Sequence, residues 1–351
     1  MTSERPTRIV ILCNEKTYDQ YIGEADLHRI HDLAEVTWVS WDAKSTDDRD
    51  LPESELAEQI GSASGLILSG GAPRITDTLM DLLPDLCFIG DMDGDRFAQR
   101  IDVEAAWARE IRVVDTTNGT SYPVAEWALG LILISLRNAG AHFRNILAGK
   151  TQKSYDEPGY LRGDLTGKRI GFIGCGHIGR RLIKFLDPFD VDLYVHDPYL
   201  PREMADALGF TLTSLDNVLS HVDVIVCLAP LTPRTKGLIG KRELDLIPSN
   251  AVFINVSRGA IVDSDALINR LKRGDIIAGL DVFDPEPIPP DSEIIQLPNV
   301  FLSPHIAGVT APSYPKMFTL MVDEMIRFLN GHEPHYELNP RSIANRRGTD
   351  L

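Results

Sequence analysis

Three polar residues in the second half of the chain combine the groups that acid–base chemistry on a small carboxylic acid requires. Arg258, Glu286 and His305 stand 28 and 19 residues apart. A guanidinium binds a carboxylate with two parallel hydrogen bonds, an imidazole transfers a proton near neutral pH, and a carboxylate beside the imidazole favours its protonated form. Alone, each residue has a more ordinary explanation, as a surface ion pair, a solvated loop residue or a satisfied polar group.

Each of these residues comes after an apolar run that predicts a strand, either directly or at the end of a short loop. The runs are residues 251–257 before Arg258, residues 276–280 before the proline-rich loop that holds Glu286, and residues 298–304 before His305. Ligands of open parallel sheets gather at the carboxyl ends of the strands. We therefore expect the three side chains to face one cleft, because their recurrence at strand ends favours a shared site.

A glycine-rich segment upstream predicts a nucleotide site. Residues 169–182 indicate a strand, a tight turn and a helix, with Gly174, Gly176 and Gly179 in the turn. The first glycine suits the turn, the second admits a pyrophosphate, and the third lets the helix pack on the strand. Such a turn alone is weak evidence. Here a second predicted strand ends in Asp197, 18 residues after Gly179, near the place of a ribose-binding acid.

The acidic residue at the end of the second strand favours NAD over NADP. Asp197 would accept hydrogen bonds from the ribose hydroxyls and repel a 2′-phosphate, and residues 198–200 supply no cation to offset that repulsion. Cys175 and His177 inside the turn are interpreted as structural residues. The predicted nucleotide turn is followed by an arginine, a carboxylate and a histidine. This combination indicates hydride transfer to a 2-oxo acid.

Residues 174–308 resemble the NAD-dependent D-isomer-specific 2-hydroxyacid dehydrogenases. The motifs that carry the resemblance are Gly-Cys-Gly-His-Ile-Gly from Gly174, Ala-Pro-Leu-Thr from Ala229 with Thr235, Asn-Val-Ser-Arg-Gly around Arg258, Asp-Val-Phe from Asp281 with Glu286, and Ser-Pro-His-Ile-Ala-Gly around His305. Formate dehydrogenases resemble the same pattern but carry glutamine in place of Glu286. The glutamate therefore argues for hydroxyacid chemistry.

The resemblance implies a role for each matched residue. Arg258 would bind the substrate carboxylate and polarise the carbonyl, while His305, paired with Glu286, would donate or accept the proton. The residues implied at the cofactor are Gly174, Gly176, His177, Ile178, Gly179, Asp197, Ala229, Pro230, Thr235, Val256 and Asp281. Those expected at the substrate are Gly70, Gly71, Gly94 and Arg258. The family also implies a homodimer.

The first part of the chain departs from the family pattern. Residues 69–73 replace an Arg-Ser-x-Thr loop, and residues 91–97 replace a Gly-x-Gly-x-Asp loop. The second segment has three carboxylates that two arginines partly offset, namely Asp91, Asp93, Asp95, Arg96 and Arg100. A pocket there would disfavour an additional phosphate on the substrate. The substrate's identity stays open.

Composition narrows the class of protein. The chain has 351 residues, enough for two domains, and a formal charge of −16, which argues against nucleic acid or an anionic membrane as a partner. The four cysteines show no CxxC spacing, so no metal site is expected. The first residues lack an apolar signal core, and no 18-residue apolar run occurs. The cytoplasm is the expected compartment.

The pattern of apolar runs predicts an α/β protein with two doubly wound parallel sheets. We expect residues 1–117 to begin one domain and residues 118–312 to form a Rossmann NAD-binding domain. The family resemblance implies that the first domain is a flavodoxin-like substrate-binding domain, and that a return segment over residues 313–351 packs on it and ends in a polar tail. Residues 125–136 predict an apolar helix too short to span a bilayer.

A second class of function remains open from the sequence. A catalytically silent protein that senses NAD, like the corepressors that share this fold, would retain the nucleotide turn. Retention of Arg258, Glu286 and His305 favours an enzyme. Turnover would decide between the two.

Overall fold

The chain folds into two compact units. The computed structural model describes residues 8–41, 53–95, 97–151 and 163–349. The first unit comprises residues 1–120 and 311–351, and the second comprises residues 121–310. The second unit is therefore an insertion in the sequence of the first.

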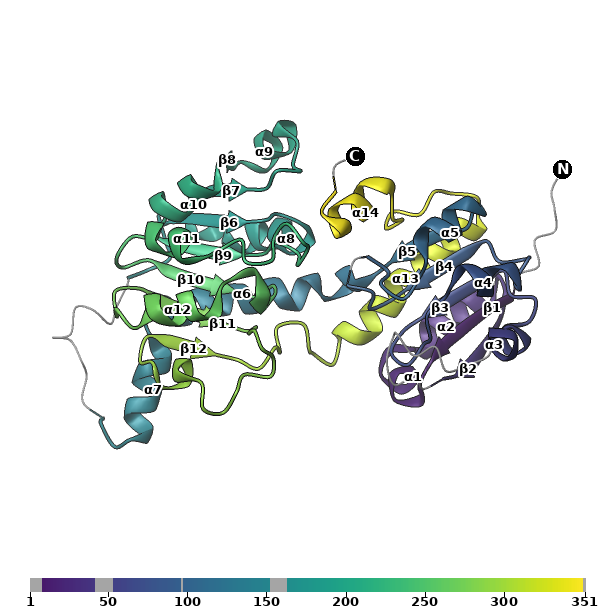
Figure 1. Cartoon of the computed structure of the whole chain (residues 1–351), viewed down its shortest axis with the longest axis horizontal. Coiled ribbons are helices and arrows are strands. Elements are labelled where there is room, and N and C mark those ends of the chain that lie inside the picture. Colours follow the sequence, from purple (N-terminus) through teal and green to yellow (C-terminus); the bar gives the residue numbers. More distant parts are fainter. Residues whose placement is uncertain (1–7, 42–52, 96, 152–162, 350–351) are drawn as a thin grey trace. The chain divides into compact units, whose positions relative to one another are not determined.

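The first unit contains a sheet of five parallel strands in the order β2-β1-β3-β4-β5 (Figure 1). The strands are β1 (Arg8–Cys13), β2 (Glu35–Ser40), β3 (Gly65–Leu68), β4 (Phe88–Asp91) and β5 (Arg112–Asp115). This order is that of flavodoxin-like folds, as predicted.

Helices cover both faces of the first sheet. One face is packed by α1 (Glu15–Tyr21), α2 (Glu24–His31) and α13 (Ser313–Leu329). The other is packed by α3 (Glu53–Ile60), α4 (Asp77–Asp81), α5 (Val103–Ala108) and α14 (Pro340–Arg347). Part of the predicted polar tail forms α14, whose start is capped by Asn339 and whose Ile343 is buried in the core.

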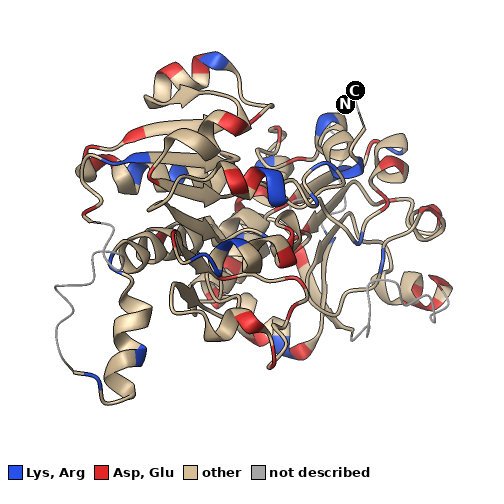
Figure 2. Ribbon diagram, turned by 60° about the vertical axis from the view of Figure 1, so that its left-hand side comes forward, with Lys and Arg blue, Asp and Glu red and all other residues tan. Residues whose placement is uncertain are grey.

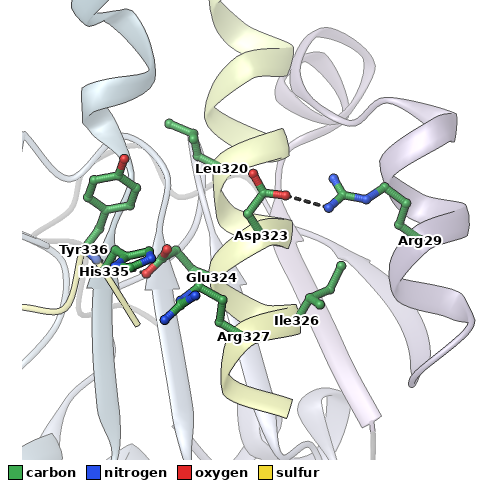
Figure 3. A pocket seen from close by; sticks show the side chains of 8 residues that line it. All are labelled: Arg29, Leu320, Asp323, Glu324, Ile326, Arg327, His335 and Tyr336. Carbon is green, nitrogen blue, oxygen red and sulfur yellow. Dashed lines mark hydrogen bonds and ion pairs between the residues drawn. The ribbon is translucent and has the colours of Figure 1, made fainter. Parts of the chain in front are cut away.

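Polar contacts attach the return segment to the first unit. Arg29 on α2 pairs with Asp323 on α13 at 2.6 Å. Within the return segment, buried Glu324 accepts a hydrogen bond from the backbone N–H of Tyr336 at 2.9 Å. These side chains border a pocket of about 360 Å³ beside α13 (Figure 3). The two carboxylates at this pocket, those of Asp323 and Glu324, already have partners within the first unit. The pocket lies beside α13, the helix through which the return segment packs on this unit.

The second unit contains a sheet of seven parallel strands in the order β12-β11-β10-β9-β6-β7-β8 (Figure 1). The strands are β6 (Arg169–Ile173), β7 (Asp192–His196), β8 (Thr211–Leu212), β9 (Val224–Cys227), β10 (Val252–Asn255), β11 (Ile277–Leu280) and β12 (Val300–Leu302). The order reverses between β6 and β9. That arrangement is the Rossmann topology, and ligands bind at such a reversal point.

Two helical layers enclose the second sheet. One layer holds α6 (Ser121–Leu136), α8 (His177–Leu186) and α9 (Arg202–Leu208), and α7 (Ala139–Leu147) contacts α6 and β12. The other holds α10 (Leu215–His221), α11 (Lys241–Leu246) and α12 (Ser264–Leu271). All strands except the edge strands are therefore shielded from water on both faces.

Helix α6 is longer than the sequence predicted. It begins at Ser121 and follows a 3₁₀ turn, η1 (Thr117–Thr120). By length and composition alone, residues 117–136 form the one candidate membrane span in the part of the chain that the structure describes, so the expectation that this segment is too short was wrong. Ala125, Ala128 and Leu131 are nevertheless fully buried in the core of the second unit.

Charged residues are distributed over both units. Asp and Glu outnumber Lys and Arg by 51 to 35, and Figure 2 shows the two kinds interspersed on the described helices and strand ends of each unit. Many are paired locally, as Arg169 is with Asp223 and Arg242 is with Asp216. The acidic excess is thus spread over the surface of each unit.

Candidate active site

The nucleotide turn joins β6 to α8 in the second unit. Gly174 has a φ of +89°, and its N–H donates to the carbonyl oxygen of His196 at 2.8 Å. A Cβ at this position would lie 2.8 Å from the backbone of Ala229, so only glycine fits. Gly176 caps α8, which begins at His177 and continues through Ile178. The helix start presents backbone N–H groups where a pyrophosphate would bind.

Gly179 allows the helix to lie close to the turn. A Cβ at this position would lie 3.2 Å from the sulfur of Cys175, which is tighter than most contacts in proteins. Cys175 is buried, and burial followed by the nearby charge of Asp197 raises the pKa of its thiol to about 12. Its side chain is therefore neutral at physiological pH, which fits the interpretation of Cys175 as a packing residue.

Asp197 ends β7 beside the same turn. One carboxylate oxygen accepts the backbone N–H of Cys175 at 2.9 Å, and the other accepts that of Tyr199 at 2.9 Å. These bonds fix the orientation of the carboxylate while the residue stays partly exposed. A ribose whose pyrophosphate occupied the helix start would meet this acid, so the residues fit a dinucleotide.

Further predicted cofactor residues lie at the same edge of the second sheet. Ala229 and Pro230 follow β9, and Val256 follows β10, the next strand in the sheet. The Thr235 hydroxyl donates to the carbonyl oxygen of Pro230 at 2.6 Å, which closes the loop after β9. The structure thus gathers these residues along the carboxyl ends of neighbouring strands, β6, β9 and β10.

Arg258 lies in a tight turn after β10. The Asn255 side chain holds this turn, because its amide donates to the carbonyl oxygen of Arg258 at 3.1 Å and its oxygen accepts the N–H of Ser257 at 3.0 Å. A Cβ on Gly259 would lie 1.9 Å from the backbone carbonyl of Phe283. The Arg258 turn is therefore packed directly against the segment that leads to Glu286.

Glu286 and His305 are in contact. Oε1 of Glu286 bonds to Nδ1 of His305, and Oε2 accepts the N–H of Phe283 at 3.4 Å. The side chains are 35% and 41% exposed, so a solute can reach them. Because Glu286 engages Nδ1, Nε2 is the ring nitrogen that can serve a substrate.

Asp281 is the buried anchor between these two segments. It is fully buried, and its carboxylate accepts hydrogen bonds from the Ser303 hydroxyl at 2.5 Å and from the N–H groups of Ile306 and Ala307 at 3.0 and 2.9 Å. The sequence predicted Asp281 near the cofactor. In the structure its carboxylate faces the His305 loop.

The predicted substrate residues lie in the first unit. Gly70 and Gly71 follow β3, where a Cβ on Gly70 would meet the Thr17 hydroxyl at 2.6 Å and Gly71 has a φ of +87°. Gly94 follows β4, where a Cβ would lie 2.5 Å from a carboxylate oxygen of Asp91. All three glycines are therefore at carboxyl ends of the first sheet in positions without room for a side chain.

The acidic loop after β4 forms an internal cluster. Asp91 is fully buried and pairs with Arg100 at 2.6 Å, and Asp93 pairs with the same guanidinium. Burial, together with the charges of Asp93 and Asp115, raises the pKa of Asp91 well above its usual range. Arg100 therefore forms ion pairs with acids in the protein interior, a role that the sequence did not indicate. Arg96 lies outside the described residues.

Residues 129–307 match the family of D-isomer specific 2-hydroxyacid dehydrogenases over its NAD binding domain. This match covers most of the second unit and includes the nucleotide turn and all three predicted catalytic residues. The chain belongs to this family, as its motifs predicted.

Relatives at about 30% identity extend across both units. The chain is 31% identical over 85% of its length to a D-3-phosphoglycerate dehydrogenase of Methanocaldococcus jannaschii, and 31% identical over 83% to glyoxylate/hydroxypyruvate reductase B of an Enterobacter species, of which it covers 89%. It spans about half the length of the phosphoglycerate dehydrogenases that it matches.

Solved structures share the fold. An NADPH-dependent glyoxylate/hydroxypyruvate reductase of Sinorhizobium meliloti, in complex with NADP and malonate, is 28% identical with a TM-score of 0.68. The similarity covers 97% of this chain and 99% of that one.

Sequence reasoning missed two residues near the predicted site. Trp127 on α6 donates its indole N–H to the Ser303 hydroxyl at 3.0 Å, and that hydroxyl bonds to Asp281. The sequence signal for Ser303 was its place in the Ser-Pro-His-Ile-Ala-Gly motif, two positions before His305. Nothing in the sequence indicates its partner, because Trp127 is 176 residues away.

Proposed function

We propose that this chain catalyses the NAD-dependent interconversion of a small 2-oxo acid and the corresponding D-2-hydroxy acid. The observation that carries the proposal is the contact between Glu286 and His305 on the sheet that also holds the nucleotide turn. An acid–base pair that solvent reaches, beside a dinucleotide site, suits proton transfer coupled to hydride transfer.

Each residue has a distinct role in the proposed reduction. The guanidinium of Arg258 binds the substrate carboxylate and draws electron density from the neighbouring carbonyl. His305 donates a proton from Nε2 to the carbonyl oxygen, and Glu286 orients the imidazole by bonding to Nδ1. The reduced cofactor supplies the hydride to the carbonyl carbon when it is bound. In the oxidation His305 accepts the proton.

We also propose that the cofactor is NAD rather than NADP. The Asp197 carboxylate is held toward the turn by two backbone N–H groups, in a place where it repels a 2′-phosphate. The S. meliloti relative is described with NADP, so the choice within this fold depends on local residues. A comparison of kcat/KM for NADH and NADPH tests the preference.

The direct test of the activity is consumption of NADH with a panel of 2-oxo acids. The panel includes glyoxylate, hydroxypyruvate, pyruvate, and branched and aromatic 2-oxo acids, each with a control lacking enzyme. We expect turnover with at least one acid and a product of D configuration, assayed by chiral chromatography. An absence of turnover across the panel, or a product of L configuration, contradicts the proposal.

We propose that the protein is a homodimer whose contacts include α7. Phe143, Ile146 and Leu147 on this helix are 63%, 58% and 72% exposed. Large apolar side chains grouped on one helix are typical of an interface. Replacing Phe143 and Leu147 with aspartate is expected to halve the mass measured by light scattering. Leu82→Asp in the first unit, where the leucine is 48% exposed, is the matched control.

The cytoplasm is the proposed compartment. The four cysteines are free thiols, which suits a reducing environment, and helix α6 is packed into the second unit. Cell fractionation with detection of the native chain tests this. Recovery in the membrane fraction after a high-salt wash would contradict it.

A further inference from the structure

The loop that holds His305 is tied to one buried carboxylate. The carbonyl oxygen of Asp281 accepts the N–H of His305 at 2.8 Å, while its side chain accepts the N–H groups of Ile306 and Ala307. Three consecutive N–H groups therefore bind one residue. His305 itself has a φ of +53°, a conformation that non-glycine residues adopt only when their surroundings hold them there.

The same residue begins the segment that carries Glu286. Asp281 directly follows β11 and precedes Phe283, whose N–H bonds to Glu286. The two partners of the acid–base pair thus come from two segments, and Asp281 belongs to one and binds the other. Any rotation of its side chain would change the geometry between the imidazole and its carboxylate.

The Ser303 hydroxyl is one of three donors that orient the Asp281 carboxylate, beside the N–H groups of Ile306 and Ala307. The Ser303 oxygen accepts the Trp127 indole N–H at 3.0 Å and donates to Asp281 at 2.5 Å. An ionised carboxylate only accepts and an indole nitrogen only donates, so the serine proton must point at Asp281. The hydrogen bonds therefore run in one direction, from the indole to the hydroxyl and from the hydroxyl to the carboxylate.

Trp127 is itself fixed within the second unit. It projects from α6, which packs against β10, β11 and β12, and its ring lies 6.5 Å from that of Phe301 on β12. The indole N–H is therefore presented from a rigid helix rather than from a loop. A donor held in this way orders its acceptor at little further cost in conformational entropy.

We propose that Trp127 and Ser303 are positioning residues that, through Asp281, hold His305 in the geometry required for proton transfer to and from the substrate. This inference rests on the proposed function. In this proposal neither side chain contacts the substrate. Both residues affect the alignment of the His305–Glu286 pair, and therefore the rate of proton transfer rather than the binding of the substrate carboxylate.

Four variants test the proposal. Trp127→Phe keeps an aromatic ring and removes the donor, and Ser303→Ala removes the hydroxyl. Ser303→Thr keeps the hydroxyl and should restore activity. Ser135→Ala is the matched control, because Ser135 is a buried serine on α6 whose hydroxyl has no hydrogen-bond partner in the described structure.

The kinetic constants separate positioning from binding. We expect Trp127→Phe and Ser303→Ala to lower kcat roughly tenfold to a hundredfold, as small misplacements of catalytic groups do. KM for the 2-oxo acid and the dissociation constant for NADH, measured by fluorescence, should change less than about twofold. Ser303→Thr and Ser135→Ala should remain within about twofold of the wild type in kcat.

The double variant tests whether Trp127 and Ser303 act along one path. The double variant should be no slower than the slower single variant, because both act through Asp281.

Three outcomes would overturn the proposal. One is a wild-type kcat in both single variants while the wild-type enzyme turns over. A second is a loss confined to KM or to NADH binding. The third is multiplicative loss in the double variant. Failure of the proposed function itself is distinguishable, because the wild-type chain would then show no turnover at all.

Discussion

Two groups of acids and bases, one in each unit, follow strands of parallel sheets and differ in exposure. In the first unit Arg100 contacts Asp91 and Asp93, and the Arg100 and Asp91 side chains are 10% and 0% exposed. In the second unit the Glu286 and His305 side chains are 35% and 41% exposed. The buried cluster can shape a loop but cannot meet a substrate. Only the half-exposed pair can exchange a proton with a solute.

The difference teaches that residue types alone do not identify a reaction site. Both groups combine a carboxylate with a basic side chain near the end of a strand. The first unit uses its arginine to neutralise acids in the interior, where an unpaired charge is costly. The second unit leaves its histidine at the surface and uses buried Asp281 to hold the loop behind it. Four substitutions sharpen or break this comparison.

Arg258→Ala is expected to have the largest effect among these four. Removal of the guanidinium takes away the proposed binding partner of the substrate carboxylate, so kcat/KM should fall about 10³-fold. NADH affinity and the free energy of unfolding should change little, because the side chain is only half-buried. Steady-state kinetics and urea unfolding measure these quantities. A lower free energy of unfolding with an unchanged kcat/KM would show that Arg258, like Arg100, has a structural role.

Asp197→Ala tests the solvent-accessible carboxylate that is proposed to bind the cofactor ribose. Loss of its charge should reduce the preference for NADH over NADPH roughly tenfold, by removing repulsion of the 2′-phosphate. The Arg234 guanidinium, which reaches the Tyr199 hydroxyl at 3.5 Å, supplies a cation on that side. The measurement is kcat/KM with each cofactor. An unchanged ratio would remove Asp197 from the cofactor site.

Glu286→Gln should slow proton transfer and leave substrate binding nearly unchanged. The amide lacks the charge of the carboxylate that bonds to Nδ1 of His305, so the imidazole is oriented and polarised less strongly. We expect kcat for reduction to fall roughly tenfold, with KM for the 2-oxo acid within about twofold of the wild type. Steady-state kinetics measure both constants. A wild-type kcat would separate Glu286 from His305 functionally, despite their contact.

Asp91→Asn should leave turnover unchanged and alter only stability. A carboxyl group with a raised pKa in the folded state holds its proton more tightly there than in the unfolded chain. Its stabilising contribution is therefore full below the unfolded-state pKa and is lost as the pH rises through the folded-state pKa. The variant lacks that loss, so its urea midpoint should fall less than that of the wild type as the pH rises. Parallel curves would contradict this.

The fold class and family were predictable because their signals are local. Apolar runs marked the strands, glycines marked the turn at Gly174, and short motifs surrounded Arg258 and His305. The contact of Glu286 with His305 was expected from chemistry, and the structure places the two side chains together. The segments that carry them follow the paired strands β11 and β12, an adjacency that parallel topology favours.

What the sequence could not predict depends on tertiary packing. The start of α6 at Ser121 and the helix α14 are stabilised by burial rather than by a strong local period. Arg100 and Asp91 are nine residues apart, but their burial follows from how the loop folds back on β4 and β5. The link between Trp127 and Ser303 joins a helix to a strand end 176 residues away.

The most direct measurement of the central claim is single turnover by His305→Asn that is preloaded with NADH. The substrate is the 2-oxo acid that the wild-type enzyme reduces fastest. We expect the variant to bind NADH with wild-type affinity, by fluorescence titration, and to oxidise it at least about 10²-fold more slowly in a stopped-flow experiment. Oxidation at the wild-type rate would contradict the assignment of His305 as proton donor, and so would a loss of rate explained entirely by lost NADH binding.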